Sequence, residues 1–167
     1  IEPFVGGGAM LFHMLQKYTN IGRVIINDIN PNLITAYRVI RDTPERLITD
    51  LKMLQREFRQ NSNEEARKEY FLRIRKSYNE DTHNDVTNTA MFIFLNRTCF
   101  NGLYRVNSKG YFNVPFGKYT NPTICDEELL LEDSKILQNV EILCGDYTLI
   151  ERYVDNNTFI YFDPPYR

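Results

Sequence analysis

Apolar residues follow a helical period in some segments of this chain and form short β-rich runs in others. A short apolar stretch ends at the glycine run 6–8, and apolar positions then recur with helical spacing from 9 to 18. Residues 23–27 contain the apolar, β-branched run 24–26 and are followed by Asp28, after which Pro31 marks the first turn of a further helix. Its expected buried face is formed by Leu33, Ala36, Tyr37 and Ile40. This order of elements is typical of half a nucleotide-binding α/β unit.

The pattern beyond residue 43 predicts a helical segment, a hairpin and a return to the first fold. We expect helices at 44–59, 64–78 and 84–98, then two short strands at 103–106 and 111–114 joined by a polar turn that ends in glycine. A helix at 126–137, a strand at 140–144, a short helix and a strand at 158–162 follow. We therefore predict an α/β, Rossmann-like core from residues 1–42 and 126–167, with four strands of which the first is a stub. Residues 43–125 form an inserted helical and β-hairpin region.

Composition places the chain among ordinary globular proteins. Its 167 residues suffice for one domain, with 43% hydrophobic and 25% charged residues and no apolar run near the length of a transmembrane helix. Cys99, Cys125 and Cys144 lie far apart, which argues against a disulfide framework or a zinc site and fits the cytoplasm. The chain begins at Ile1 rather than Met, and we expect both ends to be cuts in a longer protein.

Charge is unevenly distributed. The formal net charge is −2, yet the 40 residues from 86 to 125 contain no acid and four basic residues. Such a basic stretch in an acidic protein is a candidate contact surface for a polyanion, although a chance run without carboxylates remains the alternative.

Polar chemistry gathers where the predicted strands end. The glycine run 6–8, Asp28, the pair Asp146 and Tyr147, and Asp163 each follow a predicted strand, and parallel strands bring such ends to one edge of the sheet. A glycine turn frees N–H groups, an acid after the second strand suits ribose hydroxyls, and an acid beside an aromatic ring suits adenine. The glycine run matches neither the dinucleotide nor the P-loop pattern, so S-adenosylmethionine fits best. The alternative is a Rossmann-like sheet without a ligand.

The run 163–166 is suited to holding a flat base with an exocyclic amine. Asp163 accepts hydrogen bonds, Pro164 and Pro165 have no N–H but offer carbonyl oxygens, and Tyr166 offers a face for stacking. The alternative is a simple Asp-Pro turn that ends a strand.

Three motifs together resemble the D12 class of DNA adenine N6-methyltransferases, the Dam family. They are residues 2–9, the hairpin segments 100–107 and 112–119, and residues 163–166. The resemblance covers essentially the whole chain. It implies a site-specific adenine DNA methyltransferase that moves a methyl group from S-adenosylmethionine to N6 of an adenine flipped out of double-stranded DNA, in the sequence GATC. It implies no metal, and it leaves open a restriction endonuclease that acts on the same site.

The resemblance also assigns site residues. The cofactor-binding set is Glu2, Pro3, Phe4, Gly6, Gly8, Asp28, Asp146 and Tyr147, and the catalytic set is Asp163, Pro164, Pro165 and Tyr166. The DNA-binding set is Phe100, Asn101, Leu103, Arg105, Asn107, Pro115 and Lys118. Within it, Arg105 would read a guanine, Phe100 would wedge into the base stack and Lys118 would contact a phosphate. Asn101 would touch the base left unpaired, and Leu103 and Pro115 would pack on thymine methyl groups. Alternatively, Phe100 and Leu103 belong to the hairpin core, and Arg105 clamps a phosphate.

The chain departs from the family pattern at its ends. The family's N-terminal Lys-Trp-x-Gly-Gly-Lys-like motif and everything after the run 163–166 are absent, so we expect the isolated chain to be weakly active or inactive. Three rival interpretations remain: a nicotinamide-dependent dehydrogenase, a DNA-binding module without catalysis, and a methyltransferase that acts on RNA or protein. The acid-free hairpin with Arg105 favours duplex DNA.

Overall fold

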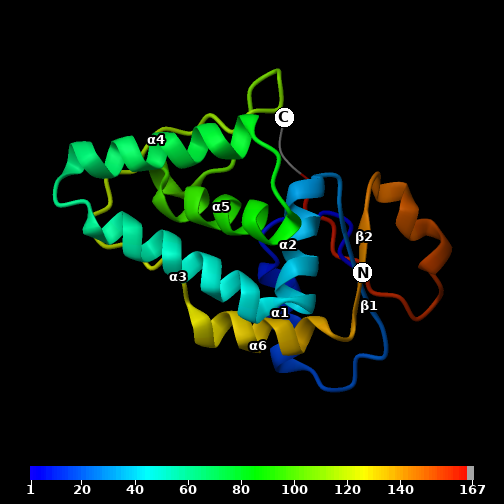
Figure 1. Cartoon of the computed structure of the whole chain (residues 1–167). Coiled ribbons are helices and arrows are strands. Elements are labelled where there is room, and N and C mark those ends of the chain that lie inside the picture. The colour runs from blue at the N-terminus through cyan, green and yellow to red at the C-terminus, as the bar shows by residue number, and fades with distance from the viewer. Residues whose placement is uncertain (165–167) are drawn as a thin grey trace. The chain divides into compact units, whose positions relative to one another are not determined.

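The computed structural model describes residues 1–164, which divide into two compact units (Figure 1). The first, here called the core unit, comprises Ile1–Asp42 and the chain from Leu131 onward, and the second, the helical unit, comprises Thr43–Leu130. Two residues of the predicted catalytic set, Pro165 and Tyr166, lie outside the described residues. The assignment of cofactor binding to one part of the chain and DNA recognition to the other stays a prediction.

The sheet of the core unit pairs β1 (Val24–Asp28) with β2 (Val140–Cys144) in parallel, with Asp28 opposite Cys144. The first residues of the chain run along the other side of β1, where the Glu2 N–H donates to the Ile25 carbonyl at 2.9 Å. The last described segment continues this order, because the Tyr161 N–H donates to the Ile1 carbonyl at 3.0 Å. Four extended segments therefore lie in the order 140–144, 24–28, 1–5 and 158–161.

The prediction of four strands is wrong for residues 1–164, of which only β1 and β2 form regular strands. The first segment makes one isolated parallel bridge, Glu2 to Ile26. Pro3 has no N–H to donate toward residues 158–162, and the chain turns at Gly6. Within residues 1–164, the backbone of 158–162 therefore pairs with the first segment at Ile1 alone, which is too short to define a strand.

Three helices cover a single apolar cluster of the core unit. They are α1 (Ala9–Lys17), α2 (Pro31–Asp42) and the C-terminal part of α6 (Glu127–Leu137). The cluster consists of Val5, Leu11, Ile26, Ile34, Tyr37, Leu137, Val140 and Ile142. Burial of Ala36 and Tyr37 on α2 confirms half of the expected face, whereas Leu33 and Ile40 are partly buried at its margin. The short 3-10 helix η2 (Tyr147–Tyr153) leads from β2 to the last segment.

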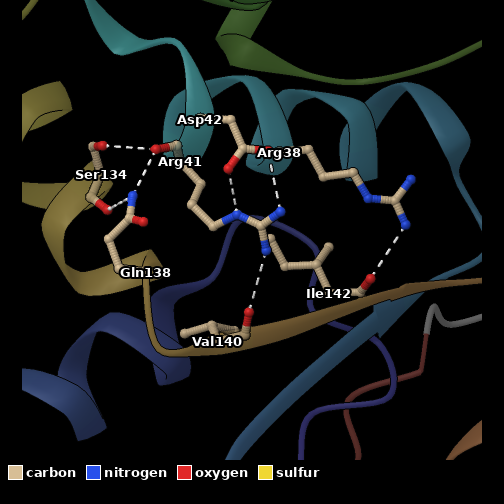
Figure 2. Close-up of polar contacts among 7 residues, drawn as sticks. All are labelled: Arg38, Arg41, Asp42, Ser134, Gln138, Val140 and Ile142. Carbon is tan, nitrogen blue, oxygen red and sulfur yellow. Dashed lines mark hydrogen bonds and ion pairs between the residues drawn. The ribbon is translucent and has the colours of Figure 1, made fainter.

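Arginine side chains of α2 protect the open edge of the sheet (Figure 2). Arg38 Nη2 donates to the Ile142 carbonyl at 3.2 Å, and Arg41 Nη1 donates to the Val140 carbonyl at 3.5 Å. Both carbonyls belong to β2, whose outer side has no neighbouring strand among the described residues. Occupied edge carbonyls do not offer a template for pairing with another chain.

Three helices form the helical unit, as the sequence predicts: α3 (Pro44–Gln60), α4 (Glu64–Glu80) and α5 (Asp85–Thr98). Local signals mark their starts, since the side chains of Asn63 and Asn84 accept hydrogen bonds from the first turns of α4 and α5. Fully buried Phe58, Phe71 and Phe94 fill the space between the helices. The Phe58 and Phe94 rings meet edge to face with centroids 5.8 Å apart.

The predicted hairpin follows the 3-10 turn η1 (Phe100–Gly102) and is looser than expected. Its two arms meet at one isolated antiparallel bridge, Val106 to Phe112, rather than along regular strands. The Asn113 N–H donates to the Arg105 carbonyl at 3.0 Å, which fixes the register. No helix in residues 1–164 is both long and apolar enough to cross a membrane.

Candidate functional site

The glycine turn at 6–8 is fixed from two sides. Its Gly6 N–H donates to Asp28 Oδ2 at 3.1 Å, and the Tyr37 hydroxyl donates to the Gly6 carbonyl at 2.9 Å. Gly8 has φ +74°, and a Cβ there would lie 2.5 Å from Tyr37 Oη. Both the backbone conformation and the close approach of Tyr37 therefore require glycine at position 8.

Glu2 is buried beside the first turn of α1. The helix begins after Gly8, which has no side chain to offer as a cap, and the backbone N–H of Leu11 in that turn favours the charged form of the Glu2 carboxyl group. Burial raises the pKa of Glu2 to about 7, the Leu11 backbone N–H and the charge of the N-terminus oppose the rise, and the charge of Asp163 adds a smaller contribution to it. Asp163 directly follows Phe162, whose ring lies 6.2 Å from the ring of Phe4 just before the glycine turn.

Asn27 ties three strand ends together and was not predicted from the sequence. Its Nδ2 donates to the Pro3 carbonyl at 3.1 Å and to the Gly145 carbonyl at 2.9 Å, and the residue is fully buried. Its Oδ1 has no donor among the described residues. The available signal was a lone amide inside the apolar run before Asp28, since a buried amide needs partners.

Aromatic rings line the edge beside the glycine turn. The Phe4 ring lies 5.7 Å from the Tyr147 ring and 6.2 Å from the Phe162 ring. Tyr147 and Phe162 are 48% and 54% exposed, and nothing lies within 4 Å of a Cβ built at Gly6. Phe162 was predicted only as part of a strand. The edge thus offers open space, exposed rings and backbone polar groups to a ligand.

Asp28 and Asp146, the acids predicted to bind ribose and adenine, already accept hydrogen bonds within the core unit. Asp28 Oδ1 accepts from the Asn30 N–H at 2.9 Å, in addition to the bond of Oδ2 with the glycine turn. Asp146 Oδ1 accepts from the N–H and hydroxyl of Thr148 at the start of η2, and these bonds lower the pKa of Asp146. A carboxylate has about four lone-pair sites, so both acids keep acceptor capacity.

A hollow of the core unit, about 640 Å³ in volume, is lined by other residues than those of this edge, apart from Glu2. Met10, Met14, Tyr18 and Phe159 are among its lining residues, and Glu2 is the one member of the predicted cofactor set there. The polar chemistry gathers at the strand ends instead, so we place the candidate site there. In the part of the chain that the structure describes, no group of His, Cys, Asp or Glu could hold a metal ion.

In the helical unit, predicted DNA-binding side chains are exposed while their neighbours are buried. Phe100 and Leu103 are each 51% exposed, so their alternative role in a hairpin core is wrong. Arg105 and Pro115 are also exposed, whereas Phe112 and Val114 are buried. The alternation turns one face of the segment 112–115 into the unit and leaves the other free for contacts.

The remaining predicted DNA-binding residues have local structural roles as well. Asn101 adopts a left-handed φ of 53° in the turn that carries Phe100. Asn107 Oδ1 accepts from the N–H groups of Lys109 and Tyr111 and so closes the hairpin turn. Lys118 Nζ lies 3.3 Å from a carboxylate oxygen of Glu64 on the protein surface.

The fold and the strand-end residues define a mixed α/β protein whose glycine turn and acids meet at one sheet edge, consistent with a methyltransferase fold. The family described as D12 class N6 adenine-specific DNA methyltransferase matches residues 1–167. The chain belongs to this family.

Named relatives agree with this membership. The chain is similar to the type II methyltransferase M.MjaIII of Methanocaldococcus jannaschii, with 52% identity over 169 residues, which cover 100% of this chain and 58% of the relative. It is 42% identical to a type II methyltransferase of Lactococcus lactis subsp. cremoris, covering 99% of this chain and 55% of the relative. It is 36% identical to a DNA adenine methylase of Vibrio cholerae, again covering 99% and 55%. The chain spans little more than half the length of these relatives.

Proposed function

We propose that this protein is a site-specific DNA methyltransferase that transfers a methyl group from S-adenosylmethionine to N6 of adenine in GATC. One observation carries the proposal: the Phe162 ring, in the residue directly before Asp163, lies 6.2 Å from the ring of Phe4, which leads into the glycine turn. Family membership of the whole chain supplies the reaction class. The type II names of two relatives make a restriction endonuclease for the same sequence the partner to seek.

The residues at the sheet edge fit an adenosine cofactor without phosphates. Open space at Gly6 permits close approach to its backbone, and exposed Tyr147 beside Phe4 offers an aromatic surface for adenine. Asp28 would accept ribose hydroxyls, and Asp146 the adenine edge. Glu2, Pro3 and Gly8 would hold the turn in place. When bound, S-adenosylmethionine supplies a methyl group on a sulfonium, which is a good leaving group.

Asp163 and Pro164 would hold the target amine. The Asp163 carboxylate and the Pro164 carbonyl accept hydrogen bonds from N6 and so direct its lone pair toward the methyl donor. Both residues are exposed and accessible to a substrate base. In the same proposal Pro165 shapes the loop and Tyr166 stacks on the base. An adenine inside a duplex cannot reach this edge, so the base must be flipped out.

The exposed face of the hairpin would read the DNA. Arg105 presents N–H donors for guanine in the major groove, and exposed Leu103 and Pro115 can pack on thymine methyl groups. Phe100 would fill the space that the flipped base leaves, next to Asn101. Lys118 would exchange its surface ion pair for a phosphate contact.

Mapping of methylated bases tests the proposal. The complete gene is expressed in a host without adenine methylation, as wild type, as Asp163→Ala and as the exposed carboxylate control Glu132→Ala. We expect N6-methyladenine confined to GATC with the wild type and the control, and none with Asp163→Ala. Methylation at another sequence would refute the assignment of the hairpin contacts. Binding of DNA and S-adenosylmethionine without any methylated adenine would refute the enzymatic function.

A further inference from the structure

The guanidinium group of Arg105 is already held in place by one residue of the opposite hairpin arm. Arg105 Nε donates to Asn113 Oδ1 at 2.7 Å, and Arg105 Nη2 donates to the Asn113 carbonyl at 3.2 Å. These two bonds occupy the Nε–Nη2 edge of the group. A guanidinium has five N–H donors, so three remain, two on Nη1 and one on Nη2. Those three have no partner among residues 1–164.

Asn113 is itself firmly placed. Its backbone N–H donates to the Arg105 carbonyl at 3.0 Å, and its neighbours Phe112 and Val114 are 2% and 1% exposed. The α4 side chains fix these neighbours further. Asn79 bonds to both the N–H and the carbonyl of Phe112, and Arg75 Nη1 donates to the Val114 carbonyl at 3.1 Å. A rigid helix thus supports the residue that holds Arg105.

We propose that Asn113 is a positioning residue that determines specificity by orienting Arg105 for guanine. This inference rests on the proposed function of the hairpin in DNA recognition. Arginine has a long side chain with much rotamer freedom, and holding its inner edge in advance leaves less to be ordered on binding. The outer edge, with its three N–H groups, has the fork geometry that pairs with O6 and N7 of guanine. Without Asn113, Arg105 is free to turn toward phosphates, which carry no sequence information.

The test uses a guanine analogue that changes a single acceptor. Duplexes carry GATC or the same site with 7-deazaguanine, which lacks N7, at each guanine in turn. The ratio of kcat/KM on the two duplexes measures how strongly N7 is read. We expect a ratio of roughly 5 to 150 for the wild type at the guanine that Arg105 contacts. Arg105→Ala sets the reference near 1.

Three further variants separate positioning from other roles. Asn113→Ala removes the side-chain acceptor for Nε of Arg105. It should lower the ratio of kcat/KM on the two duplexes about tenfold, but not below the value near 1 that Arg105→Ala gives. Asn113→Asp keeps an acceptor at the same place and should retain the wild-type ratio, even if overall DNA affinity falls. Gln60→Ala, at the exposed end of α3, should leave both kcat/KM values unchanged.

The contrary results are distinct. An Asn113→Ala variant that loses kcat/KM equally on both duplexes, with the salt dependence of binding reduced by about one phosphate contact, would overturn the proposal and make Asn113 a phosphate ligand. Failure of Asn113→Asp to restore the ratio would also overturn it. A wild-type enzyme that methylates no duplex would instead refute the proposed function, before any variant is compared.

Discussion

Replacing Gly8 by alanine should destabilise the core unit strongly, whereas the same change at Gly7 should not. Gly8 has φ +74°, and a Cβ there would lie 2.5 Å from Tyr37 Oη and 3.0 Å from the Phe12 ring. Nothing lies within 4 Å of a Cβ built at Gly7. The two neighbouring glycines therefore form a matched pair, in which the substitution is the same and the backbone conformation and the surroundings differ.

The expected magnitude follows from two terms. A left-handed backbone costs an alanine roughly 1–2 kcal/mol, and the overlap with Tyr37 and Phe12 adds about 1–3 kcal/mol. Gly8→Ala should thus lower the free energy of unfolding by about 2–5 kcal/mol. Gly7→Ala should stay within about 0.5 kcal/mol or stabilise slightly, since alanine restricts the unfolded chain.

A double-mutant cycle with Tyr37→Phe identifies the contact, with urea unfolding as the assay. Tyr37→Phe alone removes the hydrogen bond to the Gly6 carbonyl and should cost about 1 kcal/mol. In that background Gly8→Ala meets no hydroxyl, so its cost should fall by about 1–2 kcal/mol. Equal costs for Gly7→Ala and Gly8→Ala would refute the reasoning about the turn. An unchanged cost of Gly8→Ala in the Tyr37→Phe background would show that the hydroxyl is not the obstacle.

Two further predictions concern the buried polar groups of the core unit. The pKa of the Glu2 carboxyl group is raised to about 7 in the folded protein, so the folded protein keeps a proton that the unfolded chain releases. The resulting stabilisation is present below about pH 4.5 and is lost as the pH rises through 7. Glu2→Gln should therefore flatten the fall in unfolding free energy between these pH values in a urea series, whereas the exposed control Glu151→Gln should keep it. Asn27→Ala leaves two carbonyls without donors and should cost about 2–4 kcal/mol, and Asn27→Asp should cost more because it presents acceptors to acceptors. The same unfolding assay checks both, and a cost for Asn27→Asp below that for Asn27→Ala would contradict the assigned hydrogen bonds.

Helices were predicted well because their signals are local. Pro44 at the start of α3 and the capping residues Asn63 and Asn84 mark helix starts within a few residues of chain. Strands were predicted less well, because the length of a strand depends on its partner. Residues 158–162 have a strong β pattern, but the segment beside them has a proline at position 3 and turns away after a few residues.

Positions of candidate ligand-binding residues could be read from the sequence, but not what holds them. The strand-end rule brought Asp28 and the glycine turn together correctly, since parallel strands share an edge. The partners Tyr37 and Asn113 were out of reach, because their roles depend on packing and register. Tyr37 appeared only as one more buried helix position, although its hydroxyl is what fixes the turn.

Asparagine amides hold several of these backbone segments in place, and the chemistry of the amide explains why. An amide donates and accepts at once, so it can bond to an extended backbone much as a neighbouring strand would, which Asn79 does with both polar groups of Phe112. Asn27 does this less completely, because its Oδ1 is buried without a donor in the described part of the chain. An apolar side chain of similar size would spare that one acceptor but leave two carbonyls unpaired, and each buried unpaired group costs about 1–3 kcal/mol. The amide is therefore the better solution at position 27, and the positions of all three strand ends at the candidate site depend on it.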